Sequence, residues 1–124
     1  MVTTDMTVAE LLQAYERGQR EFNNLSFPEN ETVQGQDLSG IVFKNSFLFQ
    51  NFQNTNLADA KFIACNIKGV DFSGANFERG LIKNCAVEGL SLIDANIEGL
   101  NFEENYFHGN ELTQDDLDWF TKPN

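Results

Sequence analysis

Residues 70–80 read VDFSGANFERG, and the two Phe residues of this stretch, Phe72 and Phe77, are five residues apart. Apolar residues continue at the same interval toward the C-terminus, at Ile82, Val87, Leu92, Ile97, Phe102 and Phe107. An α-helix would carry residue i+5 to a different face, and a β-strand would place it on the opposite side of a sheet. The five-residue period therefore predicts a chain that bends after each short segment.

A second period, of twenty residues, is superimposed on the first. The stretch CNIKGVDFSGANFERG (65–80) aligns with CAVEGLSLIDANIEGL (85–100), so that Cys65 matches Cys85 and Gly69 matches Gly89. Internal repeats of this length are typical of solenoids. We predict a four-sided coil in which each five-residue segment forms one side. Successive coils would stack through parallel backbone hydrogen bonds at about 4.8 Å.

The pattern inside each segment predicts which side chains face the interior. The central apolar residue points inward, and so does the residue two positions before it, which must be small because the interior is narrow. Gly often stands two positions after the centre, where a turn with positive φ suits it best. The small positions are Thr55, Ala60, Cys65, Val70, Ala75, Gly80, Cys85 and Ala95, with Leu90 and Leu100 as large exceptions.

These segments share a small residue, then Asn or Asp, then a large apolar residue, as in Val70-Asp71-Phe72 and Ala75-Asn76-Phe77. In this motif the sequence resembles the pentapeptide-repeat family, over roughly residues 33–112. The resemblance implies an all-β solenoid, a right-handed quadrilateral β-helix, of about four to five coils. It implies little about function, because most members of the family have no assigned activity. Further matching segments are Thr55-Asn56-Leu57, Cys65-Asn66-Ile67 and Ala95-Asn96-Ile97.

Two irregular intervals interrupt the early repeats. With centres assigned to Phe43, Phe47 and Phe52, one interval is four residues, and it cancels a six-residue interval between Phe27 and Val33. Phe27 should then lie one coil above Phe47. Leu48 and Phe49 would face outward, and we expect the loop PENET (28–32) to cover them as satellite core; an apolar binding patch is the alternative.

Both ends of the chain carry helix signals, and we expect a single domain over residues 1–124. Thr7-Val8-Ala9-Glu10 is a capping box that predicts an N-terminal capping helix over 7–18. The β-helix would span 22–112, and a C-terminal cap over 113–121 would lay Leu117, Trp119 and Phe120 on the last coil. Such caps prevent open solenoid ends from polymerising. The C-terminal cap could act as a lid or as a dimer interface, so we expect a monomer or a weak homodimer through an end cap.

The net charge of −11 argues against direct nucleic-acid binding and against binding to anionic membranes. The acids concentrate toward the two ends, whereas residues 44–83 carry five bases and three acids. No apolar stretch is long enough to span a membrane, and no export signal is recognisable, so a cytoplasmic protein is expected. The two cysteines are too few for a disulfide-built scaffold and fit a reducing compartment.

The sequence predicts no catalytic, cofactor or metal site. His108 is the single His and should point outward, whereas Cys65 and Cys85 should point inward, so neither a Cys–His pair nor a zinc site is expected. The acid pairs Glu103-Glu104 and Asp115-Asp116 are typical of surfaces and helix starts. A further column of Asn56, Asn76 and Asn96 should form hydrogen bonds along the stack or to turn backbone.

One wall offers a candidate contact patch, made by Ile63 and Leu81 with Lys61 and Lys83 beside them. Scattered exposed apolar residues without a function are the alternative. We therefore expect a non-enzymatic interaction scaffold or regulator with an unidentified protein partner.

The alternative function comes from the resemblance, whose quinolone-resistance branch implies a DNA-mimicking, gyrase-binding protein. The net charge of the chain is negative, as a mimic of DNA requires. A stack of only about 20 to 24 Å and the basic central coils count against it.

Overall fold

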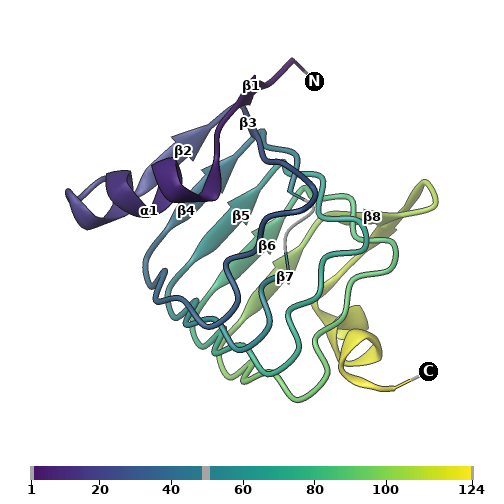
Figure 1. Cartoon of the computed structure of the whole chain (residues 1–124). Coiled ribbons are helices and arrows are strands. Elements are labelled where there is room, and N and C mark those ends of the chain that lie inside the picture. Colours follow the sequence, from purple (N-terminus) through teal and green to yellow (C-terminus); the bar gives the residue numbers. More distant parts are fainter. Residues whose placement is uncertain (1, 49–50, 124) are drawn as a thin grey trace.

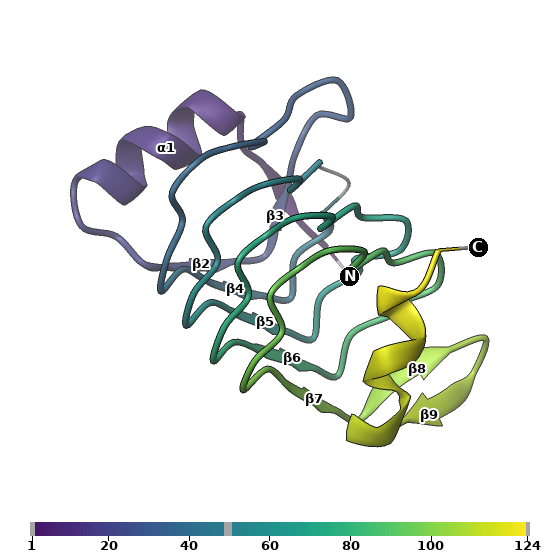
Figure 2. The same cartoon turned by 90° about the horizontal axis from the view of Figure 1, so that it is seen from below.

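The structure is a computed structural model that describes residues 2–48 and 51–123 (Figure 1). Short strands and loops alternate around a four-walled tube, with one helix at each end (Figures 1 and 2). In chain order the elements are β1 (Thr4–Asp5), α1 (Val8–Glu16), β2 (Glu21–Asn23), β3 (Leu25–Ser26), β4 (Val42–Lys44), β5 (Lys61–Ile63), β6 (Leu81–Lys83), β7 (Asn101–Glu103), β8 (Asn105–Phe107), β9 (Asn110–Leu112) and the 3-10 helix η1 (Gln114–Thr121).

Five parallel strands in the order β2-β4-β5-β6-β7 form wall 1 of the tube. Phe43 pairs with Phe22 on one side and with Phe62 on the other, and all three side chains are buried. Parallel bridges at the same spacing form wall 2 (through Asn66 and Ala86), wall 3 (Asn51, Asp71 and Ser91) and wall 4 (Asp37, Asn56, Asn76 and Asn96). The predicted β-solenoid is confirmed.

Phenylalanine rings fill the interior of the tube. Phe72 and Phe77 lie on adjacent inner walls of one coil, with ring centroids 5.3 Å apart. Phe52 stacks on Phe72 from the preceding coil at 5.1 Å. Offset-stacked and edge-to-face pairs at these distances stabilise a core beyond the burial of area alone. The abundance of Phe in the sequence, twelve of 124 residues, therefore suits a tube just wide enough for stacked rings.

Outside the loop 28–32, the chain turns at the described corners through a residue with positive φ, two positions after the centre. Gly69 and Gly74 have φ of +71° and +70°. The corner after wall 1 uses other residues in the same conformation, such as Ala64 and Asn84, with φ of +54° and +56°. Glycine is therefore favoured at three corners but required at few of them.

The prediction that Phe47 is a core centre is wrong. Ser26 bridges Phe47, so Phe27 lies above Leu48, which is 1% exposed, whereas Phe47 is half-buried. The four-residue interval runs from Leu48 to Phe52, because Ser46 fills the small inward position before it. The two irregularities still cancel: 21 residues separate Phe22 from its partner Phe43, and 19 separate Phe43 from its partner Phe62.

The predicted cover over Leu48 and Phe49 is also wrong for Leu48, because that residue belongs to the core. Phe49 lies outside the described residues. The loop 28–32 instead contacts the N-terminal cap, where the backbone N–H of Val8 donates to Glu31 Oε1 at 2.6 Å. The loop therefore helps to hold α1 on the first coil.

The helix α1 covers the N-terminal end of the tube as predicted. The capping box is formed, since Glu10 N–H donates to Thr7 Oγ1 at 3.1 Å and Thr7 N–H donates to Glu10 Oε1 at 3.0 Å. Val8 and Leu11 are buried against the core. The hydroxyl of Tyr15 donates to the carbonyl oxygen of Ser39 at 2.7 Å and fixes the far end of the helix.

The C-terminal end departs from the coil earlier than expected. After β8 the chain reverses at His108 and Gly109, which have φ of +49° and +81°, and β9 pairs antiparallel with β8. Two successive positive φ values suit a two-residue hairpin turn. The 3-10 helix η1 then caps the core with Leu117 and Phe120, whereas Trp119 is 60% exposed and does not lie buried on the last coil.

Candidate interaction surface

The four predicted patch residues lie together on the outer face of wall 1. β5 carries Lys61 and Ile63, and β6 carries Leu81 and Lys83. In the parallel register Lys61 lies opposite Leu81, and Ile63 lies opposite Lys83. The two apolar side chains are half-buried and sit diagonally between the lysines. Neighbours at these positions are close enough to act as one surface.

The neighbouring strand β4 extends this surface by two residues that sequence reasoning missed. Val42 lies opposite Lys61, and Lys44 lies opposite Ile63. The 19-residue spacing between β4 and β5 hides this match from a search with a period of twenty. We call the six outward residues the sheet-face patch: Val42, Lys44, Lys61, Ile63, Leu81 and Lys83.

Carboxylates on the outermost strands flank the sheet-face patch. Lys44 Nζ lies 2.9 Å from Glu21 Oε1 on β2, and Lys83 Nζ lies 3.9 Å from Glu103 Oε2 on β7. The hydrogen bond from Lys44 lowers the pKa of Glu21. Within the part of the chain that the structure describes, Lys61 makes no ion pair. The centre of the patch is therefore basic and apolar, with acids only at its edges.

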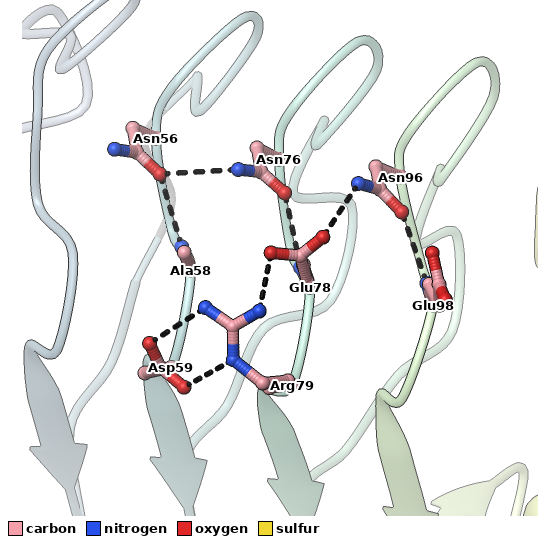
Figure 3. A network of polar contacts seen from close by, with 8 residues as sticks. All are labelled: Asn56, Ala58, Asp59, Asn76, Glu78, Arg79, Asn96 and Glu98. Carbon is pink, nitrogen blue, oxygen red and sulfur yellow. Dashed lines mark hydrogen bonds and ion pairs between the residues drawn. The ribbon is translucent and has the colours of Figure 1, made fainter.

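Wall 4 carries a polar network of a different kind (Figure 3). Asn56 Oδ1 accepts hydrogen bonds from the N–H of Ala58 at 3.2 Å and from Asn76 Nδ2 at 3.5 Å. Asn76 and Asn96 likewise accept from the backbone N–H groups of Glu78 and Glu98. The predicted role of the Asn column, along the stack and to the turns, is confirmed.

Arg79 joins two coils at the corner beside this column. Its Nε donates to Asp59 Oδ1 at 3.0 Å and its Nη2 donates to Asp59 Oδ2 at 3.1 Å, while Nη1 contacts Glu78 (Figure 3). The bidentate contact lowers the pKa of Asp59. The polar groups of this corner are therefore satisfied by one another.

The two cysteines lie together inside the tube, and His108 lies apart from them on the surface. Cys65 and Cys85 are free, buried thiols, and Cys85 Sγ donates to the carbonyl oxygen of Phe62 at 3.2 Å. The contact with Cys65 and burial both raise the pKa of Cys85. His108 is exposed in the hairpin turn, where its backbone N–H donates to Glu88 Oε1 at 2.6 Å.

Sequence reasoning missed the buried Asn105, which ends the column of Ser46, Cys65 and Cys85. Asn105 Nδ2 donates to the carbonyl oxygen of Ile82 at 2.9 Å, and Oδ1 accepts from the N–H of Cys85 at 2.9 Å. Because the period of twenty aligns Asn105 with Cys85, it could have predicted that the Asn105 side chain faces the interior. The search for small apolar residues passed over it because it is polar.

A cleft of about 290 Å³ lies between η1 and the last coil, lined by Leu90, Ile93, Phe107, Trp119 and Lys122 among others. Among residues 2–48 and 51–123, no group of three or more His, Cys, Asp or Glu residues could hold a metal ion. Neither helix in these ranges is long and apolar enough to cross a membrane.

The family model for pentapeptide repeats, in eight copies, matches residues 49–79. The described residues of this segment, 51–79, run through successive walls of the coils, and Phe52, Phe62, Phe72 and Phe77 are buried inside the tube. The chain is a pentapeptide-repeat protein. No curated protein matches this pentapeptide-repeat protein in sequence.

Solved structures of several pentapeptide-repeat proteins are similar to it. The trypsin-treated form of QnrB1, a plasmid-mediated fluoroquinolone resistance protein, has a TM-score of 0.54 and 24% identity, over 73% of this chain and 56% of QnrB1. HetL from the cyanobacterium Nostoc sp. strain PCC 7120, involved in regulating heterocyst differentiation, has a TM-score of 0.48 and 24% identity, over 81% and 44%. A protein of the Arabidopsis thaliana thylakoid lumen has a TM-score of 0.48 and 24% identity, over 70% and 75%. The chain spans about half the length of the first two, and the QnrB1 match supports the fold alone.

Proposed function

We propose that this pentapeptide-repeat protein is a non-catalytic binding protein whose sheet-face patch docks on an anionic, partly apolar surface of a partner protein. One observation carries the proposal. Three lysines and three apolar side chains alternate across β4, β5 and β6, in a chain whose net charge is −11. A surface that differs in this way from the rest of the molecule is a natural place for specific contact.

The backbone beneath the patch favours binding because it is already ordered. Each strand of wall 1 is paired with its neighbours, and the inward residues Phe43, Phe62 and Ile82 are fully buried. A rigid sheet loses little conformational entropy when a partner docks. Among residues 2–48 and 51–123 Lys61 has no ion pair to give up, so it is the lysine of the patch best placed to meet a partner carboxylate.

Two lysine variants with the same change of charge test the proposal. Lys61→Glu alters the patch, whereas Lys68→Glu alters an exposed lysine on wall 2 whose Nζ lies 3.7 Å from Glu88. Tagged wild type and both variants would be used to recover partners from lysates of the expressing cell, with quantitative mass spectrometry. We expect Lys61→Glu to lose the specific partners by about tenfold or more, because like charges would then oppose each other. Lys68→Glu should retain them.

A third variant, Leu81→Ser, tests the apolar part of the same surface. It should weaken partner recovery without changing the charge. Thermal melts of all three variants would show that the fold is kept. Equal recovery by Lys61→Glu and Lys68→Glu would overturn the proposal.

A second candidate function is DNA mimicry toward gyrase. It is supported by the likeness of fold to QnrB1, which is a fluoroquinolone resistance protein, and by the acids Asp37, Asp59, Glu78 and Glu98 on wall 4. The basic central coils oppose it. A gyrase supercoiling assay with and without ciprofloxacin tests it, and no effect at micromolar protein would remove this candidate.

A further inference from the structure

Three of the four walls are covered at the C-terminal end of the tube. On wall 1 the side chain of Gln114 closes the edge, accepting from the N–H of Phe102 at 2.7 Å and donating to the carbonyl oxygen of Leu100 at 2.9 Å. On wall 3 the N–H of Leu92 donates to the carbonyl oxygen of Phe120 at 2.9 Å. On wall 2 the strand β8 is paired with β9. η1 and the hairpin therefore act as a cap on these walls (Figure 2).

Wall 4 differs from wall 3, where Leu92 is hydrogen-bonded and only the N–H of Asp94 lacks an acceptor among the described residues, because both corresponding N–H groups of its last segment lack one. In the coils above, the N–H of Phe77 donates to the carbonyl oxygen of Asn96 at 2.8 Å, and the N–H of Arg79 donates to that of Glu98 at 2.9 Å. In the last segment of wall 4 the corresponding residues are Ile97 and Gly99, which lie twenty residues after Phe77 and Arg79. Within the described residues their N–H groups have no hydrogen-bond acceptor, and the carbonyl oxygen of Ala95 has no donor. We call residues 95–99 the wall-4 edge.

The inward side chains of the wall-4 edge are more exposed than those one coil above. Ala75 and Phe77, one coil above, are 1% and 0% exposed, whereas Ala95 and Ile97 are only partly buried. On walls 1 and 3 the last core centres, Phe102 and Leu92, are 0% exposed, whereas Phe107 on wall 2 is half-buried. The edge therefore presents two N–H donors, one carbonyl acceptor and an apolar floor at one place, in the spacing that the coils above use among themselves.

We propose that the wall-4 edge binds an extended, basic segment of a partner protein, which adds to the solenoid as one more β-like layer. Unpaired strand edges recognise extended peptides through main-chain hydrogen bonds, with alternate side chains adding specificity. Residues of the added segment would alternate like Asn96 and Ile97, one pointing outward and the next inward over the exposed core.

The charge near the edge selects the chemistry of this segment. Asp94 and Glu98 are exposed beside it, and neither has an ion-pair partner among the described residues. Residues 84–124 carry nine acids and one base. A second copy of this chain would bring like charges together, whereas a segment with outward lysine or arginine residues would be attracted. The wall-4 edge lies apart from the sheet-face patch, so the two proposals stand or fall separately.

A peptide probe with alternating residues tests the proposal. The probe is acetyl-Lys-Val-Lys-Val-Lys-amide, and the control is the same peptide with every backbone amide N-methylated. N-methylation keeps the charge, removes the donor to the carbonyl oxygen of Ala95, and places methyl groups that keep the peptide carbonyl oxygens from approaching the N–H groups of Ile97 and Gly99. Amide hydrogen exchange of the ¹⁵N-labelled full chain is followed by NMR. We expect the probe to slow exchange at Ile97 and Gly99 by about threefold or more, because both N–H groups become hydrogen-bonded. The methylated control should leave both rates unchanged.

Two charge-matched variants sharpen the test. Glu98→Lys should weaken binding of the probe about tenfold. Glu29→Lys, in the exposed loop beside α1 at the other end of the tube, should not. Equal effects of the two peptides, equal effects of the two variants, or no protection by the probe would overturn the proposal. Protection that rises with protein concentration alone would assign the edge to a second copy and would overturn it too.

Discussion

Gly80 lies so close to Phe77 that a methyl group on its Cα would be 2.4 Å from the Phe77 ring. The same methyl group would be 3.0 Å from the carbonyl oxygen of Ala60 in the preceding coil. Gly80 occupies a small inward position, as Ala60 does one coil earlier. The core centre three residues before Ala60 is Leu57, whereas the core centre three residues before Gly80 is the larger Phe77.

Gly80→Ala should therefore destabilise the protein by about 3 kcal/mol, because an overpacked core must shift backbone or ring. Gly69→Ala is the control, since a methyl group there meets no atom within 4 Å and only the positive φ is strained. That control should cost about 1 kcal/mol. Chemical denaturation would measure both. The double variant Gly80→Ala/Phe77→Leu should recover part of the loss, and no recovery would contradict the contact.

Asn105→Ala should destabilise the protein by about 1–3 kcal/mol for each backbone group left unpaired. The groups are the N–H of Cys85 and the carbonyl oxygen of Ile82. Asn101→Ala, on the exposed face of β7, is the matched control and should have little effect. Similar melting temperatures for the two variants would show that the buried amide does not close the column.

Phe72→Ala should cost about 3–5 kcal/mol, because it opens a cavity in a close-packed column of rings. The ring is fully buried and lies 5.1 Å from Phe52 and 5.3 Å from Phe77. Lys68→Ala, at an exposed outward position, should cost close to nothing. Equal shifts in thermal melts would contradict the assignment of inward and outward residues.

The contact between Asp59 and Arg79 should make the carboxylate titrate below its ordinary range. The pKa of Asp59 is lowered in the folded chain, chiefly by the hydrogen bonds from Arg79. Any stability from this pair is therefore present above the ordinary Asp pKa and is lost as the pH falls through the lowered value. NMR titration of the Asp59 carboxyl carbon would show the midpoint rise in Arg79→Gln. An unchanged midpoint would mean that the pair is not formed in solution.

Most of the fold could be predicted from the sequence, because five-residue spacing leaves few ways to bury Phe72, Phe77 and Ile82 together. The errors fall where the spacing is irregular. Phe47 and Leu48 are both apolar, and hydrophobicity alone does not say which faces inward; the buried Ser46 decides it, and a serine is a weak signal. The hairpin at His108 was missed because a turn glycine fits both a coil corner and a hairpin.

The candidate surfaces were only partly predictable. Ile63 and Leu81 were found because β5 and β6 are twenty residues apart, whereas Val42 and Lys44 were hidden by the 19-residue spacing. The wall-4 edge could not be found from its own sequence, since residues 95–99 repeat the motif of the coils above. What distinguishes them is that the described residues after them form β7, the β8–β9 hairpin and η1 and add no segment below residues 95–99, and that depends on where η1 and the hairpin fold.

The length of the solenoid is set by the number of its stacked coils. Each coil bonds only to the layers directly above and below it, and β5, β6 and β7 repeat at an unbroken interval of twenty residues. Duplicating residues 62–81 would therefore add one coil, about 4.8 Å along the stack, without changing the contacts of α1 or of the C-terminal cap. In such a chain the distance between α1 and the wall-4 edge would increase by the thickness of one coil. Variants with more coils would therefore act as spacers that hold two binding partners at distances differing by one coil each.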